Sequence, residues 1–190
     1  NLQVGEDGVT IDTPDTDTAI AGSESSVESG SSSEHSQSYN RQLSRVANIL
    51  NDFEDRIDEH IDTFKDDISE ARSQSYLKEE TLEELLIIVI DLEVGISSSV
   101  ADNLAIAYKS GPAEGVLERN LKQWTGAMER RTRRSINSIE NVLMGSGAFK
   151  DAIDSDFDTF ESEIDDSFER LSDEIEYEFS DKKSEELSDV

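Results

Sequence analysis

The chain has 190 residues, the size of one domain or of one domain with a tail, and 45 acidic against 17 basic residues give a formal net charge of −28. It contains no Cys, two His and two Pro, which excludes a disulfide scaffold, a Cys-ligated zinc site and a Cys nucleophile. So negative a charge disfavours binding of nucleic acid or anionic membrane by the chain as a whole. No stretch reaches about 18 uncharged apolar residues, so no transmembrane segment is predicted.

Residues 1–36 are predicted to form an acidic, low-complexity arm. They carry eight acidic residues, no Lys or Arg, and few large apolar side chains. Such a segment cannot bury enough surface to offset its ordering entropy. We therefore expect an extended arm that becomes ordered by lacing onto a neighbouring molecule, with VTIDT at 9–13 alternating like an edge strand.

The next segment, about 38–74, is predicted to be a long amphipathic helix. Its apolar residues are spaced by three and four positions with one four-residue stutter, which is typical of a coiled-coil-like seam. They are Leu43, Val46, Leu50, Phe53, Ile57, Ile61, Phe64, Ile68 and Ala71.

A second helix is predicted at about 81–109. Thr81 followed by Glu84 has the spacing of a capping box, which favours a helix start at Thr81. The run LLIIVI at 85–90 is apolar on all sides, so we expect it to be buried all round as the densest part of the core. Its β-branched residues are also compatible with a strand.

A third helix, about 113–144, follows the breaking sequence Ser110-Gly111-Pro112. Trp124 lies in its apolar series, where a core anchor is the favoured interpretation over a ligand cage. The series is Leu117, Leu121, Trp124, Met128, Ile136, Ile139 and Leu143.

A fourth helix, about 148–181, begins after Gly145-Ser146-Gly147 and precedes a frayed tail at 184–190. Its apolar spacing follows an eleven-residue repeat, which favours a straight or slightly right-handed supercoil. The positions are Phe149, Ile153, Phe157, Phe160, Ile164, Phe168, Leu171, Ile175 and Phe179.

One basic cluster interrupts the acidity, because residues 113–147 have a net charge of about +2 while 148–190 have about −13. Arginines in this arrangement suit bidentate contacts to carboxylate or phosphate. The cluster is therefore a candidate site for DNA or an acidic partner, although base-stacking aromatics are missing. The alternative is pairing with acidic residues of the same bundle or of a neighbouring subunit. The candidates are Arg119, Lys122, Arg130, Arg131, Arg133 and Arg134.

Other chemical motifs give little support for an enzyme. Asp154, Asp156 and Asp158 match the first ligand positions of a calcium loop, but Thr159 stands where Gly is required, so a helix is the preferred interpretation. His35 and His60 are interpreted as ordinary polar residues. We therefore expect no catalytic residues, no cofactor and no metal.

The fold class expected from these elements is all-α. Short turns favour antiparallel neighbours, which gives an elongated helical bundle at 37–183 or two long coiled-coil-like hairpins, preceded by the arm. Narrow seams leave more apolar stripe than one monomer can cover, so we expect self-association.

The composition favours a high-salt setting. Acid is spread through folded-looking segments and ten of the 17 basic residues are Arg, a pattern that resembles proteins of halophilic archaea or of their viruses. The first hypothesis is a non-enzymatic structural or assembly protein of such a system, a homo-oligomer that also contacts other subunits, in a virion or in the cytoplasm. The alternative is a helical regulatory or adaptor module that uses the basic cluster, the only route by which we expect contact with nucleic acid.

Overall fold

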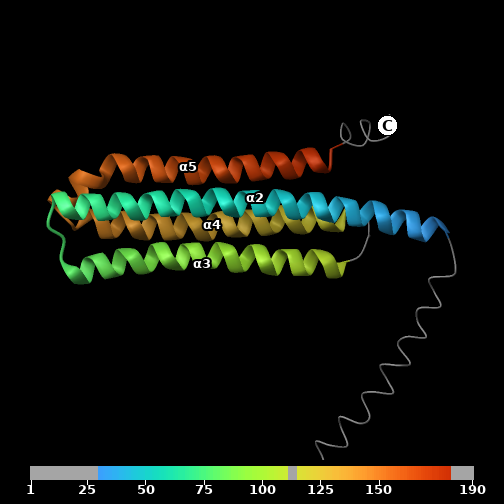
Figure 1. The fold of residues 1–190 in the computed structure, drawn as a ribbon, viewed down its shortest axis with the longest axis horizontal. Coiled ribbons are helices and arrows are strands. Elements are labelled where there is room, and N and C mark those ends of the chain that lie inside the picture. Colours follow the sequence, from blue (N-terminus) through green and yellow to red (C-terminus); the bar gives the residue numbers. More distant parts are fainter. Residues whose placement is uncertain (1–29, 111–114, 181–190) are drawn as a thin grey trace, which may run out of the picture. The chain divides into compact units, whose positions relative to one another are not determined.

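The structure, a computed structural model, describes residues 30–110 and 115–180. Within these ranges the chain forms four helices and no strand: α2 (Gly30–Gln74), α3 (Glu79–Ser110), α4 (Val116–Met144) and α5 (Ala148–Glu178). The four helices pack as a bundle, so the predicted all-α class is confirmed (Figure 1). The segment VTIDT and the tail at 184–190 lie outside the described residues.

The chain divides into two compact units, residues 1–42 and 43–190. In the first unit the described part is helical, because α2 begins at Gly30. Helix α2 thus starts before the predicted start at about residue 38, within the segment 1–36 that was predicted as an arm. Once a helix is nucleated, each added residue gains a hydrogen bond at small cost, so a polar sequence can extend an existing helix.

In the second unit each helix contacts two others. Helix α2 reaches α3 through Lys65 Nζ, 2.6 Å from Glu93 Oε2, and it reaches α5 through the rings of Phe53 and Phe168, whose centroids are 5.0 Å apart. Helix α4 packs against α3 on one side and α5 on the other. Consecutive helices run in opposite directions, so the bundle is antiparallel (Figure 1).

The core is built on the seams of α2 and α5. Every apolar residue predicted for the seam of 38–74 is buried, from Leu43 to Ala71. Phe64 stacks on Phe160 of α5 with ring centroids 4.4 Å apart and a 10° interplanar angle. Burying one such side chain contributes about 1.5–3 kcal/mol, so aromatic contacts form a main part of the packing between these two helices.

Helix α3 differs from its prediction in two ways. It begins at Glu79, so Thr81 lies inside the helix rather than at its N-cap. The run at 85–90 was predicted to be buried all round, but Ile87 is 58% exposed and Ile90 47% exposed. A helix in a four-helix ring turns only one side toward the core, so a run that covers its whole circumference must leave some residues outside.

Helices α4 and α5 depart from prediction at single positions. Trp124 is only half-buried, and Thr125 occupies the seam beside it, with its hydroxyl donating to the Leu121 carbonyl oxygen at 2.8 Å. At the end of α5, Phe179 is half-buried while Glu178 is buried. The internal hydrogen bond lets a threonine replace an aromatic residue in the seam at little cost.

Candidate interaction surfaces

The histidine and carboxylate positions considered from sequence do not converge on one site. Among the described side chains, no group of three or more His, Asp or Glu residues is placed to hold a metal ion. His60 Nδ1 of α2 lies 2.9 Å from Glu163 Oε2 of α5. The segment 154–158 lies within helix α5 and Phe157 is buried, so the helical interpretation of this acidic run is confirmed. The side chain of His35 lies outside the described residues.

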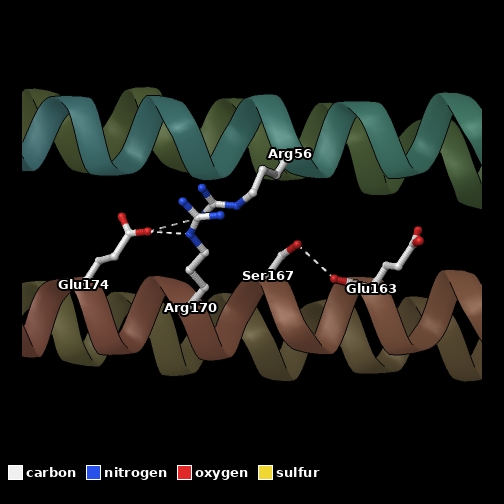
Figure 2. A network of polar contacts seen from close by, with 5 residues as sticks. All are labelled: Arg56, Glu163, Ser167, Arg170 and Glu174. Atoms are coloured by element: carbon white, nitrogen blue, oxygen red, sulfur yellow. Dashed lines mark hydrogen bonds and ion pairs between the residues drawn. The ribbon is translucent and has the colours of Figure 1, made fainter.

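A polar network beside the core joins α2 to α5 (Figure 2). Arg170 Nε donates to Glu174 Oε1 at 2.7 Å, and Arg56 Nη2 lies 4.0 Å from the same oxygen. Burial lowers the pKa of Arg56, as does the positive charge of Arg170, while Glu174 opposes both effects. Both guanidinium groups thus share one carboxylate, and Arg56 Nε and Nη2 have no hydrogen-bond partner among the described residues, so the network is a loose link between the two helices.

Charge is distributed unevenly over the four helices. Helix α4 carries six basic and three acidic residues, whereas α5 carries two basic and 13 acidic residues. The acidic residues of α4, Glu118, Glu129 and Glu140, are spaced eleven residues apart and so share one flank of the helix. Arg133 of α4 bridges Glu129 and Asp165 of α5, which places this flank on the side of α5.

Within the predicted basic cluster, two residues form ion pairs. Lys122 Nζ lies 2.9 Å from Glu118 Oε1, and Arg133 Nη2 lies 3.3 Å from Glu129 Oε1 and 3.4 Å from Asp165 Oδ1. These are exposed pairs, which typically contribute about 0–1 kcal/mol each.

The other four members of the cluster are exposed and form no ion pair within residues 37–109 and 115–180. The structure thus separates the cluster into two paired residues on the α5 flank and a set of unpaired guanidinium groups. This unpaired set, called the α4 basic face below, consists of Arg119, Arg130, Arg131 and Arg134.

The second unusual surface is the outward side of α3, of which only the run at 85–90 was predicted to be buried. Seen at 100° per residue, six exposed apolar residues of α3 lie on the side opposite the buried ones, whereas Ile106, which is 54% exposed, lies on a different side. The buried series is Leu82, Leu85, Val89, Leu92, Ile96 and Val100. The exposed series, called the α3 stripe below, is Ile87, Ile90, Val94, Ala101, Ala105 and Tyr108. The sequence contained one indication of this exposed surface: the run at 85–90 has more apolar residues than one seam of a helix requires.

No family model, curated protein or solved structure matches the chain. Among the described helices, none combines the length and apolar content needed to cross a bilayer. The two surfaces therefore have to be interpreted from their own chemistry.

Proposed function

We propose that the protein is a non-enzymatic structural protein, a four-helix scaffold that assembles with copies of itself and with other subunits through outward helix faces. The observation that carries this proposal is the α3 stripe. Three of its large residues, Ile87, Ile90 and Val94, are each about half exposed or more, although the seams of the bundle already fill the core. Contiguous exposed apolar surface is typical of sites that bind another molecule.

The acidic surface supports a high-salt setting for this scaffold. Burial and then neighbouring carboxylates raise the pKa values of Asp58, Asp67 and Glu161. Carboxylates so close together repel one another, and screening shortens the range of that repulsion from about 10 Å at 0.1 M salt to about 3 Å at 1 M. The same proposal makes the protein a component of a halophilic archaeon or of its virus. It includes coiled-coil-like packing along the seams and an acidic N-terminal arm, predicted at 1–36, that laces onto a neighbour.

Solution mass and helicity across a salt series test the scaffold proposal. Light scattering and circular dichroism would be recorded from about 0.1 M to about 3 M KCl, the range in which screening changes most. We expect an oligomer that forms, and gains helix, as salt rises. A compact monomer with the same mass and helicity at every salt concentration would contradict the proposal.

The α4 basic face favours a second candidate function, a helical adaptor that binds an acidic partner or DNA. Its four arginines form no ion pair with the described residues, so carboxylate or phosphate groups of a partner can serve as counter-charges. Replacing Arg130, Arg131 and Arg134 by Ala is expected to abolish retention on immobilised polyglutamate or duplex DNA without loss of helicity. Lys122→Ala is the matched control because Lys122 is already paired with Glu118. Retention unaffected by the triple substitution would contradict this candidate.

A further inference from the structure

We infer that a second copy of this chain covers the α3 stripe, in an antiparallel two-fold pairing that places Ile87 of each copy against Tyr108 of the other. This inference rests on the proposed self-assembly and specifies its interface. It is carried by the spacing, the residue sizes and the flanking charges of the stripe.

The spacing of the stripe is the same in both directions along the helix. From Ile87 to Tyr108 its intervals are three, four, seven, four and three residues. Two copies placed antiparallel therefore meet position by position, with Ser97 and Ser98 at the two-fold axis. An isologous dimer requires such a self-complementary surface.

Residue size follows the same symmetry. Ile90 and Val94 lie in the N-terminal half of the stripe, and they would pack against Ala105 and Ala101 of the second copy. Ile90 and Val94 each meet an alanine, and the two ends of the contact are equivalent because each pairs an Ile87 with a Tyr108. A parallel pairing would place Ile on Ile and Val on Val in the N-terminal half of the stripe but Ala on Ala at positions 101 and 105, which leaves a gap there.

The charges beside the stripe favour the same register. Asp91 and Arg131 line one groove between α3 and α4, together with Gly95, so this flank of α3 faces α4. Asp102 lies eleven residues after Asp91 and so shares its flank. In the antiparallel register Asp102 of the second copy stands level with Glu93, close to the height of Arg131, whose guanidinium forms no ion pair in the described part of the chain.

Two further charge contacts across the pairing have opposite signs. Lys109 of one copy would lie within one turn of Glu84 of the other, an attractive contact. Asp91 of one copy would also lie within one turn of Asp102 of the other, which is a repulsive contact. Each copy has a net charge of −28, so screening weakens the overall repulsion between two copies while it leaves apolar burial intact. We therefore expect salt to strengthen the pairing.

The size of the contact predicts a reversible dimer. The stripe from 87 to 108 extends about 33 Å, and a helix about 10 Å wide covers roughly 330 Å² on each copy, or roughly 700 Å² in total. This is below the roughly 1,200 Å² buried in standard stable interfaces. The pairing is therefore expected to depend on concentration, and to become persistent where further contacts hold the copies together.

Single-cysteine variants test the direction and register, since the native chain has no Cys. Ser98→Cys lies beside the two-fold axis and is expected to cross-link to itself with a short bis-maleimide. Ile87→Cys is the matched control on the same face, because its two copies would be about 31 Å apart. A mixture of Ile87→Cys and Tyr108→Cys is expected to cross-link only as the heterodimer. Self-linking of Ile87→Cys, or no linking of Ser98→Cys, would overturn the antiparallel pairing.

Sedimentation equilibrium of a variant with a charge in the α3 stripe tests this inference separately from the proposed function. Val94→Glu is expected to weaken dimerisation at least tenfold with helicity unchanged, because Val94 is 57% exposed in the single chain. Met144→Glu on α4, 67% exposed, is the control with the same added charge. An oligomer that Val94→Glu leaves intact would overturn the α3 interface and leave the scaffold proposal standing. A wild-type chain that stays monomeric at every concentration and salt would overturn both.

Discussion

Asn103 shows at the scale of one residue how a polar side chain can cost stability in this core. It occupies a seam position of α3 and is 4% exposed, and its Nδ2 finds no hydrogen-bond partner among the described residues. A buried amide without a partner typically costs about 1–3 kcal/mol. A polar residue in a seam can also specify which helix positions face one another, at the expense of stability.

We therefore expect Asn103→Leu to raise the free energy of unfolding by about 1–2 kcal/mol, because the unpartnered amide is replaced by an apolar side chain of similar volume. Urea unfolding followed by circular dichroism measures the change. Asn137→Leu, at an exposed position of α4, is the control and is expected to change stability by less than about 0.5 kcal/mol. A loss of stability in Asn103→Leu would show that the amide has a stabilising contact.

At the scale of elements, the connection from α4 to α5 depends on one backbone conformation. Gly147 precedes α5 with φ 57° and ψ −126°, a region that side chains disfavour, whereas Gly145 ends α4 with an ordinary φ of −93°. Gly147→Ala is expected to lower the free energy of unfolding by about 1–3 kcal/mol. Gly145→Ala is the matched control: its added Cβ would meet only the Val142 carbonyl oxygen, at 3.9 Å. Thermal unfolding of both variants measures the difference, and equal midpoints would contradict the role given to Gly147.

At the scale of the whole molecule, the raised carboxyl pKa values predict how stability depends on pH. Burial and neighbouring carboxylates raise the pKa values of Asp58, Asp67 and Glu161 above their ordinary values. The folded state then binds protons more readily than the unfolded state, so the free energy of unfolding rises as pH falls through the carboxyl range. We expect the thermal midpoint at 0.1 M KCl to increase as the pH is lowered from 7 to 5. At 3 M KCl the increase should be smaller, because salt screens the repulsion between carboxylates but leaves the effect of burial. A thermal midpoint that decreases as the pH is lowered from 7 to 5 would contradict the prediction.

The sequence alone determined that the chain forms four helices, and it determined the seam of α2 and, except at Phe179, that of α5. Helical periodicity is local, since each residue advances by about 100°, so residues such as Phe53 and Ile164 could be assigned to one face without any neighbour. The break before α5 was equally local, because it includes Gly147 at a positive φ.

Only the tertiary structure decided which sides of α3 and α4 are covered. Ile87 and Ile90 are as apolar as Leu85, but α2 and α4 lie beside one side of α3 and leave the opposite side open. In the same way, Arg133 and Arg134 are adjacent in sequence, yet only Arg133 points to the flank where Asp165 of α5 is within reach. Which side chains are covered and which charges are paired depends on contacts between residues far apart in the chain. How the helices pack sets the positions of those residues, and local periodicity does not encode that packing.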